Sequence, residues 1–535
     1  MSVRLLFISL KQTFFLRQVF NTLRVVFLSL AHLLLAAPSL LAQQDVVPAL
    51  QEWTSKKGKF SITEKSSIVV DPAVFDIIKE DLDIFSEDLF TITKMRLPIR
   101  QEAIARHDGD IKFIQSPDAS NQPEAYRLII DGQLTVTAST SNGFFYAMQT
   151  ILQSLVQSKD KLSLTRGTAY DFPAYKERGV MLDIGRKFFE VDYIKKTIRD
   201  LSWYKMNLLH LHFTEWHSFR LQSTLYPGLA AKESYSKKDI AEIESYAKKY
   251  HVIIVPEIDL PGHATAITNY NPNLGFSCAS MREARWQGDS TNAKGQAWIL
   301  DVTKPETKIW VKALLDEFIP LFNGPYFHIG GDEWQYDDQK EACPELMEAT
   351  RKLGFKYPGD VIVNFMNEMN AHVKSRGKRS QMWTWWNYSP NEKQQNKYSV
   401  IPDKDVVINI WNAESMEATL KDGYKSVVTI ESGEGALYIT PGYGKKLGDY
   451  AYFDSKANYE KWQPSRHENV LGFKICIWAD QAERMPSEWF DGYADFPKAI
   501  LAERIWSRAA SPTVDQFKLR VDKAKKASEL FKTSR

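Results

Sequence analysis

The chain has 535 residues, of which 44% are hydrophobic and 25% are charged. This composition is typical of a globular protein with a large buried core, and it excludes a wholly disordered chain, a collagen-like fibre and a polytopic membrane protein. With 68 basic and 66 acidic residues the formal net charge is +2, which gives no reason to expect nucleic acid or an anionic membrane as a partner.

The first 42 residues differ from the rest of the chain. Arg17 and Arg24 precede an apolar run over residues 25–42, which ends in small residues before a polar segment. A basic flank, an apolar stretch and a small-residue end are typical of a secretory signal peptide. We therefore predict cleavage near Ala42 and an exported mature chain that does not stay on the membrane. An uncleaved anchor helix is the alternative.

Cysteine is sparse. Cys278, Cys343 and Cys476 form neither an even disulfide set nor a CxxC metal motif. We expect an exported protein that does not depend on disulfides.

Residues 43–170 are predicted to form an α+β domain. Helical periodicity covers 74–91 and 142–156, and short strand-like runs surround these segments. The strand candidates are FSI, SSIVV, RLPIR, DIKFI, EAYRLII and LTVTAS. The tripeptide DGQ at 131–133 predicts a hairpin turn between the last two.

From residue 171 to 510, short β-rich runs alternate with longer helical patterns. The eight strand candidates are 179–184, 207–213, 252–258, 326–331, 379–385, 406–411, 426–430 and 470–478. The expected helices are 191–205, 237–250, 305–321, 361–376 and 492–507. This order predicts a (β/α)8 TIM barrel; an open doubly wound sheet is the alternative, weakened because no GxGxxG follows the first strand. Residues 511–535 are expected to form a C-terminal helical tail.

A barrel of this kind carries its functional groups at the carboxyl ends of its strands. Aromatic and polar residues gather at those positions: Arg186, Glu215, Trp216, Glu257, Asp259, His263, Asp332, Glu333, Trp383, Trp411, Tyr438, Trp478 and Asp480. Trp and Tyr offer flat faces for a sugar ring, and carboxylates and Arg bind its hydroxyls. Without a phosphate loop or a GxSxG elbow, we interpret the chain as a carbohydrate-active hydrolase.

Asp332 and Glu333 are neighbours in the sequence, whereas glycoside hydrolysis normally uses two carboxyl groups that flank the bond. Adjacent residues that leave a strand point in different directions. Such a pair suits a division of labour, with one residue as the proton donor and the other positioning the substrate. This arrangement is expected where the 2-acetamido group of the substrate is the nucleophile.

The segment HIGGDE at 328–333 resembles the signature of the glycoside hydrolase family 20 β-N-acetylhexosaminidases. RGVMLDIGRKFF (178–189), WYKMNLLHLHFTE (203–215) and VPEIDLPGH (255–263) are similar to the first three barrel strands of that family. The resemblance implies a retaining exo-glycosidase that removes terminal β-linked N-acetylhexosamine from an oligosaccharide or glycoconjugate, with no cofactor and no metal. It leaves the oligomeric state open.

The resemblance also implies roles for the catalytic residues. Glu333 matches the general acid/base. Asp332 matches the carboxylate that orients and polarises the acetamido N–H, and Tyr438 matches the hydroxyl that binds the acetamido carbonyl. The implied intermediate is an oxazolinium ion.

The remaining site residues follow in the same way. Arg186 matches the arginine that binds the C3 and C4 hydroxyls, and His263 matches a histidine behind the acid. The aromatic box around the sugar is matched by Trp383, Trp411 and Trp478. Asp480 is expected to contact the substrate, and Glu215 and Asp259 to support the catalytic residues from behind.

Three positions depart from the family pattern. Thr214-Glu215-Trp216 replaces the usual TDD, which puts the reach of Glu215 towards His263 in doubt. Thr440 stands where Asp is frequent, and Asp480 where Glu is frequent. The Asp form resembles the lacto-N-biosidases of the family, so release of a disaccharide is an alternative activity.

Two further alternatives concern other classes of protein. His210 and His212 form an HxH pair that is a possible metal site, although we expect a structural pair on one strand face. A non-catalytic glycan-binding protein on the same scaffold is the other alternative. Intact Asp332, Glu333 and Tyr438 argue against it, because binding alone does not need them.

Overall fold

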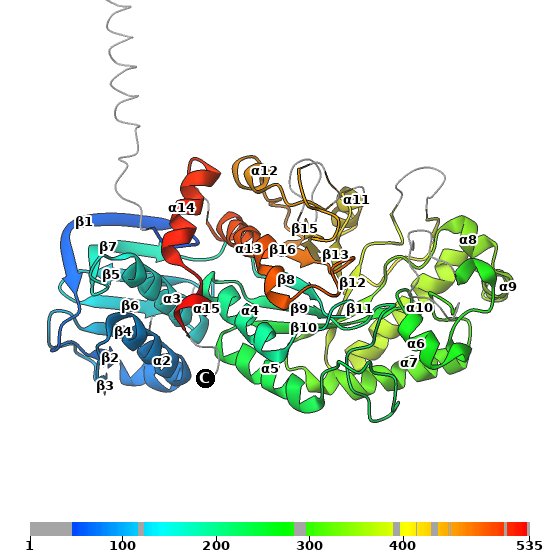
Figure 1. Ribbon diagram of the computed structural model, residues 1–535, viewed down its shortest axis with the longest axis horizontal. Coiled ribbons are helices and arrows are strands. Elements are labelled where there is room, and N and C mark those ends of the chain that lie inside the picture. The colour runs from blue at the N-terminus through cyan, green and yellow to red at the C-terminus, as the bar shows by residue number, and fades with distance from the viewer. Residues whose placement is uncertain are drawn as a thin grey trace, which may run out of the picture.

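The computed structural model describes residues 45–115, 122–282, 296–388, 396–413, 415–429, 437–447, 449, 451–507 and 511–531. The predicted signal peptide, residues 1–42, lies outside the described residues. Within the described ranges, no helix has the length and apolar character needed to cross a membrane. The chain folds into an N-terminal α+β domain beside a barrel (Figure 1).

The N-terminal domain is a seven-stranded sheet in the order β1-β7-β5-β6-β4-β2-β3. Its strands are β1 (Glu52–Ser61), β2 (Ile68–Val70), β3 (Ile99–Gln101), β4 (Ile111–Gln115), β5 (Tyr126–Ile130), β6 (Leu134–Ala138) and β7 (Ser163–Asp171). The helices α2 (Pro72–Thr93) and α3 (Ser141–Gln157) pack on it and on each other. Alternating buried and exposed residues along β5 match a sheet with one covered face. The antiparallel β5–β6 pair confirms the predicted hairpin at 131–133.

The second sheet confirms the predicted barrel. Eight parallel strands close on themselves through the β14–β16 and β16–β8 pairs. They are β8 (Glu177–Asp183), β9 (Leu208–His212), β10 (Ile253–Leu260), β11 (Tyr326–Gly330), β12 (Arg379–Trp383), β13 (Val407–Ile410), β14 (Ser426–Val428) and β16 (Val470–Ile477). The strands are buried almost throughout, because helices cover the outside and side chains fill the inside.

The outer helices lie where the sequence places them, to within a few residues. The long ones are α4 (Val191–Trp203), α5 (Lys237–Lys249), α7 (Pro305–Phe318), α10 (Pro358–Ser375) and α13 (Asp491–Trp506). Short elements occupy the connections: α6 (Thr265–Tyr270), η1 (Pro272–Leu274), η2 (Ala279–Met281), η3 (Ile319–Leu321), α8 (Asp337–Glu341), α9 (Pro344–Lys352), α11 (Met416–Lys421), α12 (Ser455–Glu460) and η4 (Ser487–Trp489).

The seventh barrel position is built from two pieces. β14 pairs with the first half of β16, whereas β15 (Tyr438–Ile439) pairs with its last residues, Cys476 and Ile477. We did not expect β15 as a separate strand, because two residues carry no periodic pattern. It sets Tyr438 at the carboxyl end of the barrel.

The C-terminal helices lie between the two domains. α14 (Val514–Ala524) packs on α3 of the N-terminal domain, and α15 (Ala527–Leu530) packs on α4 of the barrel (Figure 1). The C-terminal tail therefore contributes to the interface between the two domains.

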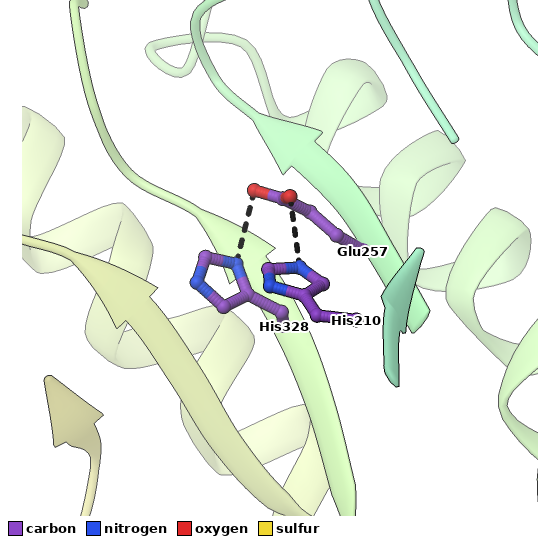
Figure 2. A group of neighbouring side chains, drawn as sticks. All are labelled: His210, Glu257 and His328. Carbon is purple, nitrogen blue, oxygen red and sulfur yellow. Dashed lines mark ion pairs between the residues drawn. The ribbon is translucent and has the colours of Figure 1, made fainter. Parts of the chain in front are cut away.

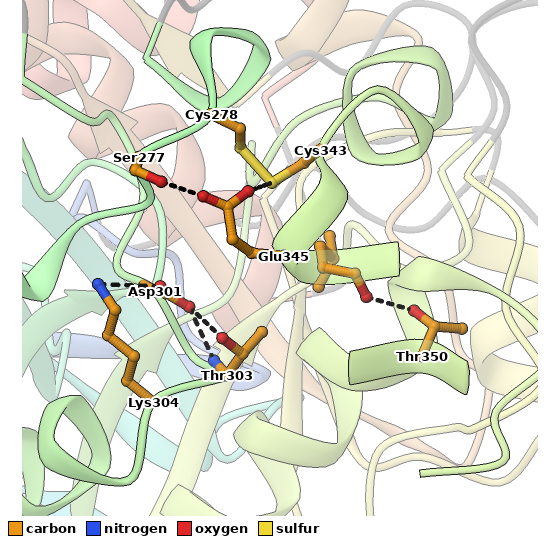
Figure 3. The surroundings of a disulfide bond; sticks show 9 residues. Ser277, Cys278, Asp301, Thr303, Lys304, Cys343, Glu345 and Thr350 are labelled. Atoms are coloured by element: carbon orange, nitrogen blue, oxygen red, sulfur yellow. Dashed lines mark hydrogen bonds and ion pairs between the residues drawn. A yellow bond between two sulfur atoms is a disulfide. The ribbon is translucent and has the colours of Figure 1, made fainter. Parts of the chain in front are cut away.

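The expectation that the protein makes no use of disulfides is wrong. Cys278 and Cys343 are bonded, with Cα atoms 5.4 Å apart (Figure 3). Cys476 is a buried free thiol. The two cysteines are 65 residues apart, so no local motif marks them as a pair. Cys278 precedes η2 and Cys343 precedes α9, so the bond joins the connections that follow β10 and β11.

Candidate active site

A cavity of about 310 Å³ opens at the carboxyl ends of the barrel strands. Its lining residues are Arg186, Trp216, His263, Trp298, Asp332, Glu333, Trp411, Tyr438, Thr440, Tyr443, Trp478 and Asp480. Eight of these are predicted site residues, brought together from distant parts of the chain. A cavity of this size with aromatic walls and a few charged groups is typical of a small-molecule site.

The backbone around Asp332 and Glu333 is strained. Gly330 and Gly331 have φ of 72° and 102°, and Glu333 itself has a φ of 41°, which is rare for a residue with a side chain. A Cβ atom at Gly330 would lie 1.7 Å from Asp259 Oδ1, so only glycine fits there. These features explain the glycines of HIGGDE and match the strain found at functional sites.

Asp332 lines the cavity with a largely buried carboxylate. Its Oδ1 atom is buried and has no hydrogen-bond partner in the part of the chain that the structure describes. Burial raises the pKa of Asp332 to about 6; nearby His263 lowers it and the charge of Glu333 raises it. Asp259, whose pKa burial and Asp332 raise well above its usual range, donates a hydrogen bond to Asp332.

His263 links Glu215 to Glu333. Its Nδ1 atom lies 3.0 Å from Glu215 Oε2, and its Nε2 atom lies 3.1 Å from Glu333 Oε2 and 3.6 Å from Asp332 Oδ2. The longer Glu215 side chain therefore reaches His263, which answers the doubt raised by the departure from TDD. Burial lowers the pKa of His263, but the charges of Glu215 and Asp332 outweigh it and raise the pKa well above the usual value.

Arg186 is held rigidly by three carboxylates. Its Nη1 atom lies 2.9 Å from Asp183 Oδ2 and 2.6 Å from Glu215 Oε1, and its Nε atom lies 3.3 Å from Asp480 Oδ1. The guanidinium also lies over the Trp478 ring, 5.3 Å from its centroid. Because the arginine is already fixed, it can hold sugar hydroxyls at little further cost in side-chain entropy.

The predicted aromatic residues separate into two groups. Trp411, Trp478 and Tyr438 line the cavity. Trp383 lies beneath it, only 1% exposed, and donates from Nε1 to Glu257 Oε1 at 2.6 Å. Direct contact of Trp383 with substrate stays a prediction.

Sequence reasoning did not assign several lining residues a role. Trp216, Trp298 and Tyr443 all line the cavity. Trp298 donates from Nε1 to the backbone oxygen of Glu333 at 3.1 Å, and its ring packs on His263. Trp298 comes from a segment without periodic pattern, so only its aromatic character could have marked it. Trp334, Trp385 and Trp386, which also follow barrel strands, are buried and do not line the cavity.

The HxH pair belongs to a buried cluster whose possible ligand atoms lie close enough together to hold a metal ion. His210, Glu257 and His328 lie together inside the barrel (Figure 2). However, Lys474 Nζ lies 2.6 Å from His210 Nδ1, and a second cation beside an ammonium group is unfavourable. His212 Nδ1 contacts the same carboxylate. These contacts favour a pair that holds the barrel interior together, and the absence of a metal there stays a prediction.

A (β/α)8 barrel with a carboxylate pair, an arginine clamp and aromatic walls at its carboxyl end defines a glycoside hydrolase. The family model for the glycosyl hydrolase family 20 catalytic domain matches residues 175–509, and the model for domain 2 of that family matches residues 43–172. The chain belongs to glycosyl hydrolase family 20.

Individual relatives agree with this assignment. The chain is 26% identical over 513 residues to a beta-hexosaminidase of Porphyromonas gingivalis, covering 90% of this chain and 62% of that protein. It is 23% identical over 504 residues to a lacto-N-biosidase of Bifidobacterium bifidum, covering 91% and 42%. A solved GH20 beta-N-acetylhexosaminidase of Streptomyces coelicolor A3(2) has a TM-score of 0.70 at 25% identity, covering 91% of this chain and 96% of that one. The chain thus spans less than two thirds of the length of these two curated relatives.

Proposed function

We propose that this chain is a retaining exo-glycosidase that removes terminal β-linked N-acetylhexosamine, with the acetamido group of the substrate as the nucleophile. The adjacent carboxylates of Asp332 and Glu333, which both line the cavity, carry the proposal. Among the described lining residues, the third carboxylate is Asp480, and it is paired with Arg186. A carboxylate that flanks the acid, rather than opposing it, suits a nucleophile supplied by the substrate.

The proposed reaction has two steps. Protonated Glu333 donates its proton to the glycosidic oxygen while the acetamido oxygen attacks C1, so that the C1–O bond breaks and an oxazolinium ion forms. Asp332 accepts the acetamido N–H and stabilises the positive charge, and Tyr438 donates to the acetamido oxygen. Glu333 then removes a proton from water, whose oxygen attacks C1 while the bond from C1 to the acetamido oxygen breaks; this frees the acetamido group and restores the β configuration.

Arg186 and the cavity walls hold the sugar in this scheme. The fixed guanidinium binds ring hydroxyls, and Trp411 and Trp478 pack on the apolar faces of the sugar and its acetamido group. The glycan is the partner of the site. We further propose that the protein is exported, which the signal-like first 42 residues and the Cys278–Cys343 bond support.

Release of a disaccharide is the second candidate. Thr440 and Asp480 both line the cavity, and each is shorter than the residue frequent at that position in the family, which leaves more room around the outer hydroxyls. The similarity to a lacto-N-biosidase favours the same reading.

The test compares three chromogenic substrates side by side: an N-acetyl-β-glucosaminide, an N-acetyl-β-galactosaminide and a lacto-N-bioside. The proposal expects turnover of at least one monosaccharide substrate, and preference for the third would establish the second candidate. Glu333→Gln should lower kcat by at least ~10²-fold, as expected for loss of a general acid. Binding of all three without turnover would identify a glycan-binding protein and overturn the proposal, and so would near-normal activity of folded Glu333→Gln.

A further inference from the structure

A line of alternating carboxylates and imidazoles runs from the centre of the barrel to the acid. Beyond the contact of His263 with Glu215, the other Glu215 oxygen, Oε1, lies 3.2 Å from His212 Nε2. His212 Nδ1 lies 2.5 Å from Glu257 Oε2. Glu257, His212 and Glu215 are all fully buried. The line therefore extends two residues deeper than the pair that directly supports Glu333.

His212 faces a carboxylate at each ring nitrogen. Both nitrogens must therefore carry protons to bond Glu257 and Glu215, so the ring is a cation. Burial lowers the pKa of His212, but the charge of Glu257 and the hydrogen bond to Glu215 outweigh it and raise the pKa well above the usual value. An imidazolium held at both ends cannot rotate without breaking an ion pair.

Glu257 is fixed from four sides. Its Oε2 atom contacts His212 and, at 3.0 Å, His210 Nε2. Its Oε1 atom lies 3.0 Å from His328 Nδ1 (Figure 2). The same oxygen accepts a hydrogen bond from Trp383 Nε1 at 2.6 Å. These partners come from β9, β11 and β12, and Glu257 itself from β10, so one carboxylate ties four strands beneath the cavity.

The contact of His212 with Glu215 opposes the attraction of the same carboxylate to Arg186. Arg186 Nη1 lies 2.6 Å from the same Glu215 oxygen. Without His212, the arginine would be the main partner of that oxygen and would draw the carboxylate towards the substrate hydroxyls. Glu215 would then lose the orientation in which its second oxygen holds His263.

We propose that His212 and Glu257 are positioning residues for the acid/base step, acting through Glu215 and His263 to fix the carboxyl group of Glu333. This inference rests on the proposed function. It separates these two residues from the rest of the buried cluster, because His210 and His328 contact Glu257 but lead away from Glu215.

The test uses the dependence of the rate on the leaving group. Aryl N-acetyl-β-glucosaminides with strongly basic phenols need protonation of the leaving oxygen, whereas a dinitrophenol leaves without it. A residue that only stabilises the fold would affect all members of the series alike. His212→Gln and Glu257→Gln are therefore compared with the full-length wild type across the series, with His210→Gln as the matched control.

We expect both test variants to lose about tenfold or more in kcat on the most basic phenols and less than about threefold on the dinitrophenyl substrate, within the range of general acid catalysis. His210→Gln should change all substrates by the same factor. Equal losses across the series in the test variants, or no loss, would overturn the inference. A wild type inactive on the whole series would instead overturn the proposed function.

A second measurement covers variants that fail to fold, because breaking a buried ion pair is costly. In the wild type labelled with 15N-histidine, both His212 and His263 should remain imidazolium ions at a pH at which an ordinary histidine is already neutral. A spectrum with fewer than two imidazolium ions at that pH would overturn the inference without any variant.

Discussion

In the proposed mechanism, Asp332 has to be ionised to stabilise the positive charge that develops on the acetamido nitrogen. Burial, opposed by His263 and assisted by Glu333, raises its pKa to about 6. Protonation removes the negative charge, so we expect kcat/KM to fall as the pH decreases through about 6, by about tenfold per pH unit below it. A pH–rate profile on an aryl N-acetylglucosaminide checks this, and a flat profile through that range would contradict it.

Asp480 provides the matched control, because burial raises its pKa to about 6 as well, against the opposing charge of Arg186. Asp480→Asn should keep the acid limb and mainly raise KM, since this residue contacts the sugar in our scheme. Asp332→Asn should lose the limb together with about 10²-fold or more in kcat, as for removal of a preorganised electrostatic group. If only Asp480→Asn lost the acid limb, the limb would belong to Asp480 and its assignment to Asp332 would be wrong.

The residues of the site were predictable where a motif or a strand end marked them, as for Arg186 and Glu333. The contact of Glu215 with His263 was not predictable. Whether a side chain with one extra methylene reaches its partner depends on the path of the backbone after β9. Trp298 was missed since a residue in an irregular loop has no register that relates it to the strand ends.

At the scale of elements, the disulfide joins the two connections that carry His263 and Glu333. It closes 65 residues that include Asp332 and Trp298. Beside it, the Glu345 carboxylate lies 3.4 Å from Cys343 Sγ and accepts a hydrogen bond from Ser277 (Figure 3). The bond thus limits the freedom of the two loops in the unfolded chain and in the native site.

The double variant Cys278→Ser/Cys343→Ser should lower the free energy of unfolding by up to about 4 kcal/mol, the loop-closure value for this separation. Denaturant unfolding of the oxidised wild type and the variant measures the difference. Reducing the wild type should reproduce the loss and leave the variant unchanged. Equal stability of oxidised and reduced wild type would show that the bond contributes nothing.

Elements with a long, continuous pattern were predictable. The eight barrel strands are apolar runs in the sequence, because both faces of each strand are covered. The helices are amphipathic, and the spacing of their apolar residues indicates which face is buried. β15 was not predicted, because it is a strand only through its pairing with the end of β16. Nothing in the residue types of Tyr438 and Ile439 indicates a strand. The disulfide was equally hidden, since only the folded loops bring Cys278 and Cys343 together.

At the scale of the whole molecule, buried ion pairs join the N-terminal domain to the barrel. Lys205, which follows α4, lies 2.8 Å from Asp171 Oδ2 and from the hydroxyl of Tyr126, and no part of the ion pair is exposed. Arg178 of β8 binds Glu124 through both terminal nitrogens. These contacts fix the domains far from the cavity.

Lys205→Met should therefore destabilise the protein without affecting catalysis. It leaves Asp171 buried without its cation, which costs about 3–5 kcal/mol in unfolding free energy. Asp171→Asn/Lys205→Met should recover part of that loss, because no uncompensated charge remains. Unfolding curves and kcat/KM below the transition check both statements, and a stable Lys205→Met with altered kcat/KM would contradict them.

The central claim is that the acetamido group of the substrate is the nucleophile. Its most direct test is the ratio of kcat/KM for a 4-nitrophenyl N-acetyl-β-glucosaminide to that of the matching β-glucoside, which carries a hydroxyl at C2. Our account predicts a ratio of at least about 10², because the hydroxyl cannot form an oxazolinium ion and leaves Asp332 without the charge it stabilises. Comparable rates for the two substrates would contradict the account.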